Sequence, residues 1–369
     1  MLFLPRRLAL LCLAILLVSI GADVMASGQA EPPAPEAWEA LKRGDAAKAA
    51  SLFREALDRS PRNPLLHFGA GYAAYALGRH DDAIAALKRA LEYDSSFVQA
   101  AALLGTVAYA NSDLDLAIRS MEKAAALAPN DPRIRRQLEQ WRKESSVHAG
   151  LNERTTVRFR VLYEGTEQQA IGDRVSSVLE SSYWTIGKQL NSYPGEALTV
   201  VLYTNRQFRD ITRAPAWAGG GYDGRIRLPV SGALRTPATL DRVVRHELVH
   251  AMIAHVAPRN VPTWVNEGLA SVLESSDRTW VKKALAQTSE VFTLEDLSDG
   301  FDHLDGAEAL VAYAESAVAA EILCERLGPN LGVFIQMLGT GHTPDQALST
   351  LNVRPEAFHA EWRKRIGIR

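Results

Sequence analysis

The stretch His246-Glu247-Leu248-Val249-His250 decides how the second half of the chain is interpreted. His246 and His250 are four residues apart, so on a helix both imidazoles leave the same face and can bind one metal ion. Glu247 lies one position further round, close enough to take a proton from a metal-bound water without ligating the metal. The flanking apolar residues predict a buried helix of about four turns: Val243, Val244, Leu248, Val249, Met252 and Ile253.

A third ligand is expected within Trp264-Val265-Asn266-Glu267-Gly268-Leu269-Ala270. A catalytic zinc ion takes three protein ligands and keeps a fourth position open. The prolines at the ends of residues 258–262 predict a turn that reverses the chain. A second helix from about Thr263 would then return Glu267 toward the two histidines.

The two motifs together resemble those of the gluzincin zinc metallopeptidases, the branch that contains thermolysin and the zinc aminopeptidases. Within it the sequence is most similar to bacterial peptidase-MA-like domains that follow tetratricopeptide repeats. The resemblance covers roughly residues 155–367 and implies a zincin-like fold. It implies His246, His250 and Glu267 as ligands of Zn²⁺ and Glu247 as the general base. The spacer before Glu267 is slightly shorter than in thermolysin.

Two related patterns do not fit this chain. A metzincin site needs glycine and histidine where Ile253 and Val256 stand, and His255 points off the shared helix face. The aminopeptidase signature Gly-Ala-Met-Glu-Asn is absent from the sequence, so trimming of amino ends is not implied.

Tyr313 is a further candidate for catalysis. Val311-Ala312-Tyr313-Ala314-Glu315-Ser316 resembles the Tyr-x-x-Ser stretch of peptidase-MA-like domains. There a phenol near the metal hydrogen-bonds the oxyanion that forms when water attacks the carbonyl. The alternative is a core tyrosine on the face of a helix.

Residues 30–130 repeat with a period of 34. Small and bulky residues recur at that interval, which is the pattern of tetratricopeptide repeats: Ala49, Ala83 and Ala117; Ala56, Ala90 and Ala124; Phe53, Leu87 and Met121. The sequence therefore predicts a helical solenoid over residues 30–144, with a capping helix over residues 132–143. Repeats of this kind bind peptides or proteins, so a protein partner is expected on the solenoid.

Three tyrosines fall on the concave face by their repeat positions: Tyr72, Tyr75 and Tyr109. They could form a peptide-binding patch or fill the space between repeats. Basic residues that would clamp a carboxyl terminus do not cluster there, so the partner stays unnamed.

Residues 144–155 are polar and are expected to be a linker, after which residues 151–369 form the second domain. Residues 157–163 alternate as a strand should, a helix is predicted over residues 167–190, and a second strand over residues 198–203. Helices are predicted beyond this sheet region, roughly over residues 277–287, 307–327, 331–338, 345–351 and 355–366.

A glycine-rich run at residues 219–224 predicts a hairpin, because no Gly-Lys-Ser/Thr follows to make a phosphate loop. Pro229 cannot donate to a strand ladder, so its strand is expected at the edge of the sheet. An edge strand beside the metal helix could hold an extended substrate through its main chain, or be covered by a loop. The predicted fold class is α+β and mostly helical, with an α-solenoid before a domain with a small sheet.

The first residues predict export. Arg6 and Arg7 precede an apolar run, and Val24-Met25-Ala26 suits a signal peptidase, so residues 1–26 are expected to be a signal peptide. The apolar run of residues 8–20 is too short to span a bilayer, so a membrane contact is expected only through an uncleaved signal segment. The expected location is periplasmic or secreted. A net charge of −2 argues against nucleic acid as a partner.

The sequence thus favours a zinc metallopeptidase, expected to be an endopeptidase, that cleaves peptide or protein substrates, with recruitment of the substrate or a partner by the repeats. One alternative is an envelope scaffold in which the zinc domain is structural or vestigial. The intact Glu247 argues against it, since a purely structural site has no use for a base. A second alternative is a zinc hydrolase that acts on a non-peptide amide.

Overall fold

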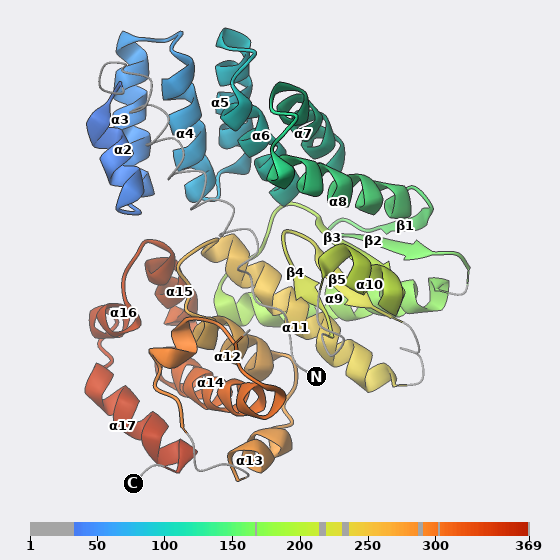
Figure 1. The fold of residues 1–369 in the computed structure, drawn as a ribbon. Coiled ribbons are helices and arrows are strands. Elements are labelled where there is room, and N and C mark those ends of the chain that lie inside the picture. Colours follow the sequence, from blue (N-terminus) through green and yellow to red (C-terminus); the bar gives the residue numbers. More distant parts are fainter. Residues whose placement is uncertain are drawn as a thin grey trace. The chain divides into compact units, whose positions relative to one another are not determined.

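The computed structural model describes residues 33–166, 168–213, 219–230, 236–286, 291–301 and 303–367 (Figure 1). Within this part the chain divides into two compact units, residues 33–149 and residues 150–367. The expected signal peptide lies outside the described residues. Among the residues that are described, no helix is long and apolar enough to cross a membrane.

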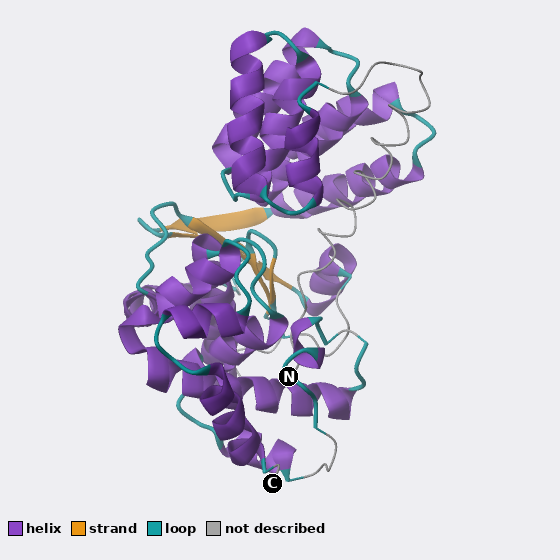
Figure 2. Ribbon diagram, turned by 90° about the vertical axis from the view of Figure 1, so that its left-hand side faces the viewer, coloured by secondary structure: helices purple, strands orange, loops and turns teal. Residues whose placement is uncertain are grey.

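The N-terminal unit consists of helices alone (Figure 2). Six helices form three antiparallel pairs and a seventh follows: α2 (Pro35–Lys42), α3 (Ala46–Arg59), α4 (Pro64–Ala76), α5 (His80–Tyr93), α6 (Val98–Ala110), α7 (Leu114–Leu127) and α8 (Pro132–His148). The repeating alanines predicted as close contacts are buried, and Ala49, Ala83 and Ala117 have no exposed surface. Small residues at these positions let the paired helices approach closely. The predicted repeat pattern is confirmed.

The concave-face tyrosines mainly fill the space between helices. Tyr72 is buried. Tyr109 stacks on Trp141 at a centroid distance of 4.8 Å, and its hydroxyl donates to Glu144 Oε2 at 2.7 Å. Tyr75 is half-buried, with its ring 5.9 Å from that of His80. Packing between repeats therefore explains Tyr72 and Tyr109 without a bound peptide.

The second unit contains a five-stranded mixed sheet in the order β1-β2-β3-β5-β4. Its strands are β1 (Leu151–Thr155), β2 (Phe159–Glu164), β3 (Leu198–Tyr203), β4 (Gly221–Tyr222) and β5 (Ile226–Pro229). Strands β2, β3 and β5 are parallel, while β1 and β4 pair antiparallel at the two edges. Helix α9 (Gln169–Leu190) makes the crossover from β2 to β3 and packs on β2. The predicted fold class, mostly helical with a small sheet, is confirmed.

The boundary between the two units falls between Ala149 and Gly150, within the predicted linker, but most of residues 144–155 are not a loop as expected. Helix α8 continues to His148, and β1 starts at Leu151. The four residues after Leu151 in β1 are exposed, so the strand shows no alternation of apolar and polar residues. Main-chain pairing with β2 forms this strand, from Leu151↔Glu164 to Thr155↔Arg160, and an apolar pattern could not reveal it.

The predicted edge position of the Pro229 strand is also wrong. Strand β5 lies between β3 and β4, and β4 is the edge strand. Within the described part of the sheet, however, β4 pairs with Ile226 and Arg227 alone. The N–H of Val230 donates to the carbonyl of Tyr203 on β3, so the nitrogen of Pro229 points to the other side, beyond the end of β4. The proline therefore disrupts no ladder. The predicted hairpin is confirmed as β4–β5, with Gly224 at φ 102°.

Helices complete this unit and surround the core: α10 (Asn205–Thr212), α11 (Pro237–Val256), α12 (Thr263–Leu273), α13 (Thr279–Leu285), α14 (Gly306–Leu327), α15 (Leu331–Gly339), α16 (Pro344–Thr350) and α17 (Pro355–Ile366). Most helices predicted after residue 277 are confirmed to within about one residue, while α13 is shorter at both ends. Helix α11 is buried on nearly all sides from Leu240 onward, as expected for a helix that is apolar around its circumference.

One buried carboxyl in this core has no ion-pair partner among the described residues. Glu315 on α14 is 1% exposed, and its Oε2 accepts the N–H of Phe292 at 3.1 Å. Its Oε1 has no hydrogen-bond partner among the described residues. Burial raises the pKa of Glu315 to about 7. The folded protein therefore binds this proton more tightly than the unfolded chain does.

We expect Glu315 to make stability depend on pH. Its neutral form stabilises the fold fully below the unfolded pKa of about 4.5, and this contribution is lost as pH rises through the folded pKa of about 7. The Glu315→Gln variant should therefore be more stable than the wild type at pH 8, by on the order of 2 kcal/mol, and nearly equal at pH 5. Urea denaturation at both pH values measures this. Glu321→Gln, on a half-exposed position of the same helix, should show no such pH-dependent gain.

Candidate metal centre

Helices α11 and α12 carry the three predicted ligands. Asp241 on α11 binds Arg174 of α9 through both carboxylate oxygens, at 2.7 and 2.8 Å, which fixes the start of α11. The chain reverses after Val256, with Asn260 in the left-handed region at φ 62°, and Pro262 precedes the first residue of α12. This is the predicted turn, and it returns the second helix to the first.

Gly268 fixes the depth at which α12 packs. A Cβ at this position would lie 2.3 Å from the carbonyl oxygen of Ser316, so α12 and α14 contact each other through main chain. No larger residue fits without separating the two helices. The neighbouring Glu267 is thereby held on the side of α12 that faces α11.

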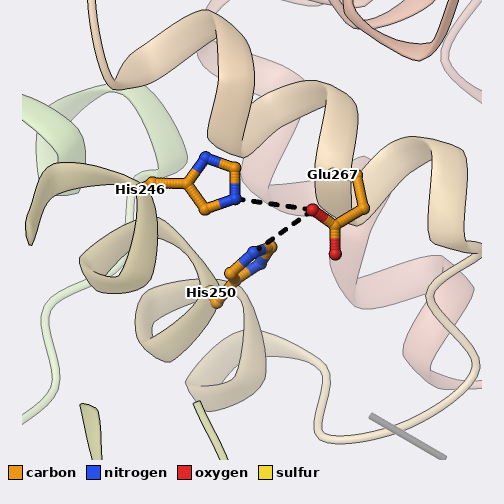
Figure 3. A group of neighbouring side chains, drawn as sticks. All are labelled: His246, His250 and Glu267. Carbon is orange, nitrogen blue, oxygen red and sulfur yellow. Dashed lines mark ion pairs between the residues drawn. The ribbon is translucent and has the colours of Figure 1, made fainter. Parts of the chain in front are cut away.

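The side chains of His246, His250 and Glu267 converge (Figure 3). Glu267 Oε2 lies 3.4 Å from His246 Nε2 and 3.5 Å from His250 Nε2. The two imidazole rings are 4.7 Å apart and nearly perpendicular. All three side chains are buried. The structure thus brings together the three residues that the sequence selected as ligands.

These donors fit a zinc ion. Bonds of about 2.0–2.1 Å to nitrogen and oxygen place the corners of a tetrahedron about 3.3 Å apart, close to the separations of Glu267 Oε2 from the two histidine nitrogens. Glu267 Oε2 and both ring nitrogens of His250 have no hydrogen-bond partner among the described residues, although they are buried. Buried polar atoms without partners are costly, and a cation bound between Glu267 Oε2 and His250 Nε2 would satisfy these two atoms.

The charges of this cluster are strongly coupled. Burial raises the pKa of Glu267, but the neighbouring His250 and His246 outweigh it and lower the value to about 2. Burial alone would lower the pKa of His246, and the carboxylates of Glu267 and Glu274 reverse this and raise it to about 9. The site therefore attracts positive charge, either as protons or as a metal ion, and the two compete.

Glu247 is placed as a base beside the cluster without joining it. It is fully buried, and neither carboxylate oxygen has a hydrogen-bond partner among the described residues. Burial raises its pKa to about 7. Gly220, next to β4, lies directly against this carboxylate, since a Cβ there would be 2.6 Å from Glu247 Oε1. The edge of the sheet thus passes beside the predicted base.

Glu274 belongs to the site and was missed in the sequence. Nδ1–H of His246 donates to Glu274 Oε2 at 2.7 Å, and Arg242 Nη1 lies 3.6 Å from the other oxygen. This bond orients the ring so that Nε2 lies 3.4 Å from Glu267 Oε2, where it could ligate a metal ion. The spacing in the sequence could have indicated Glu274 as a site residue. It follows Glu267 by seven residues, or about two helical turns, and so lies on the same face of the helix.

We expect Glu274→Ala to lower zinc affinity by about 10- to 100-fold, because His246 loses the partner that fixes its tautomer. Competition with a chromogenic chelator measures this directly. Glu274→Gln, which keeps an oxygen acceptor for Nδ1–H, should recover part of the affinity. Equal zinc affinities for the wild type and Glu274→Ala would show that Glu274 does not support the metal site.

Tyr313 on α14 is buried in the core of the second unit. Its ring packs edge-to-face on that of Phe301, with the ring centroids 5.1 Å apart. This contact suits the structural alternative that the sequence left open. Its role toward an oxyanion stays a prediction.

Comparison with known proteins identifies the repeats. The tetratricopeptide repeat family matches residues 35–94 and 70–132, which leaves residues 133–369 outside the match. The TPR repeat-containing protein MJ1428 of Methanocaldococcus jannaschii is 31% identical over 91 residues, which is 25% of this chain and 16% of that protein. This chain therefore spans about a sixth of that relative's length.

Two solved structures show more distant similarity. The first TPR of Spaghetti (RPAP3) bound to an HSP90 peptide shares 20% identity over 31% of this chain and 90% of that chain, with a TM-score of 0.30. The myosin chaperone UNC-45 from C. elegans in complex with a Hsp90 peptide shares 13% identity over 90% of this chain and 28% of that chain, with a TM-score of 0.28. Residues 35–132 are therefore assigned as tetratricopeptide repeats on the family match alone.

Proposed function

We propose that the protein is a zinc-dependent peptidase of the gluzincin type, with the tetratricopeptide repeats recruiting a protein substrate or partner. One observation carries the peptidase proposal. Two histidine nitrogens lie 3.4 and 3.5 Å from one carboxylate oxygen, close to tetrahedral spacing, beside a separate buried glutamate. A structural zinc site would close its fourth position with another ligand and would not need Glu247.

Each residue has a defined task in this proposal. His246, His250 and Glu267 would hold a zinc ion, which would supply a Lewis acid to polarise the scissile carbonyl and lower the pKa of water to about 7. Glu247 takes the proton of the attacking water and delivers it to the leaving amine. Its raised pKa, about 7, suits a group that must both accept and release a proton near neutral pH. Glu274 holds His246 in the ligating tautomer.

The edge strand offers a place for an extended substrate. Strand β4 has one side unpaired within the described sheet, and it contacts α11. An extended peptide that pairs with this edge would run past Glu247, which lies against Gly220. We further propose a periplasmic or secreted location, on the basis of the predicted signal peptide.

A scaffold is the second candidate function, favoured by the family match of the repeats. The two proposals separate in one experiment. Purified protein should contain close to one zinc per chain and cleave members of a peptide library. Chelation should abolish cleavage, and added zinc should restore it. If the protein contains zinc but cleaves no peptide, the scaffold function is favoured. If it contains no zinc, both the metal site and the peptidase function are rejected.

A further inference from the structure

An exposed pair of aromatic rings lies at the C-terminal end of α9. Trp184 is 54% exposed and Tyr193 is 43% exposed, and their ring centroids are 5.6 Å apart at an interplanar angle of 47°. Single exposed apolar residues are ordinary, but large aromatic rings usually lose most of their surface to the core. With Arg158, these residues form what we call the α9 aromatic patch.

The patch is held rigidly. Tyr193 lies across Gly187, where a Cβ would be only 2.4 Å from the tyrosine ring. Glycine is unfavourable inside a helix, but at position 187 it leaves the space that the ring of Tyr193 occupies. The guanidinium of Arg158 lies 4.6 Å from the centre of the Trp184 ring and donates to Glu180 Oε2 at 2.8 Å. The rings are thus ordered before any partner arrives, which lowers the entropic cost of binding.

The polar groups of the patch are mostly hydrogen-bond donors. Trp184 offers an indole N–H, which can only donate, and Tyr193 offers a hydroxyl. Neither group has a hydrogen-bond partner among the described residues. The positive charge of Arg158 is balanced by Glu180, so the patch carries no excess charge to attract phosphate groups.

We propose that the α9 aromatic patch binds a proline-rich peptide segment in the polyproline II conformation. Proline has no backbone N–H, so such a segment presents carbonyl acceptors and flat apolar ring faces. Both features match a surface of aromatic rings and free donors. A glycan would also stack on the rings, and binding of a glycan is therefore the alternative outcome of the test below. This inference does not depend on the peptidase proposal.

Binding of fluorescein-labelled decaproline to the full chain, followed by fluorescence anisotropy, tests the proposal. A glycine-serine decapeptide is the control ligand. We expect Trp184→Ala to weaken decaproline binding at least about tenfold, because a central aromatic anchor is lost. Tyr193→Phe keeps the ring and removes one donor, so it should weaken binding by about threefold or more. Leu127→Ala changes an exposed apolar residue of the repeat unit and should leave binding unchanged.

Melting temperatures of the variants show whether each one is folded, and Trp184→Ala removes a largely exposed side chain. The proposal is overturned if the wild type shows no saturable decaproline binding at millimolar concentration. Equal binding by wild type and a folded Trp184→Ala variant also overturns it. Binding of chitohexaose or cellohexaose that requires Trp184, without decaproline binding, would assign the patch to a glycan instead.

Discussion

The Glu247→Gln variant should lose peptide hydrolysis by about 10²- to 10⁴-fold while it keeps zinc and its fold. Glutamine has nearly the same size as glutamate but cannot take a proton from water. The three ligand atoms belong to other residues, and Glu247 has no hydrogen bond among the described residues that the change would break. Removing a buried carboxyl whose pKa is raised to about 7 should not destabilise the protein at neutral pH.

Three measurements are needed together for this prediction: zinc per chain, melting temperature, and kcat/KM on the best peptide from the library. Glu356→Gln, which removes a carboxylate from an exposed position on α17, is the matched control and should leave all three unchanged. Cleavage by Glu247→Gln at the wild-type rate would exclude Glu247 as the base. A cellular role that survives the change unaltered would favour the scaffold for that role.

The sequence predicted those parts of the fold in which residues of the same size recur at a regular interval. The period of 34 gave the repeats because the alanines it marks, such as Ala49 and Ala83, are the points where helices contact each other. Strand β1 was missed because its side chains are exposed and only its main chain is paired. The edge assignment of Pro229 failed because a two-residue strand, β4, lies beyond it and stops short of the proline.

The part of the candidate site that lies on a single helix could be predicted from the spacing of its residues. The spacing of His246 and His250 sets their common face, and the turn before α12 had only to bring Glu267 within reach. Two contacts depend on how separate elements pack, and no motif gives them. They are the approach of Gly220 to Glu247 and the bond from His246 to Glu274.

The Glu267→Ala variant should lose zinc almost completely, with affinity reduced on the order of a hundredfold or more. Glu267 is the only anionic member of the three converging ligands, and its Oε2 is near both histidine nitrogens. Without it, two neutral imidazoles 4.7 Å apart would have to hold a divalent cation in a buried site. The desolvation of that cation would then be poorly compensated.

Metal analysis after dialysis against a weak chelator measures the loss, and the apoprotein of the wild type provides the reference for folding. Glu267→Asp is the informative companion, because it keeps the charge and withdraws the oxygen by one methylene. Moving α12 toward α11 to compensate would open its close main-chain contact with α14 at Gly268. We therefore expect Glu267→Asp to bind zinc with an affinity between those of the wild type and Glu267→Ala. Full zinc occupancy in a folded Glu267→Ala protein would mean that another group ligates the metal, and the assignment of Glu267 would fall.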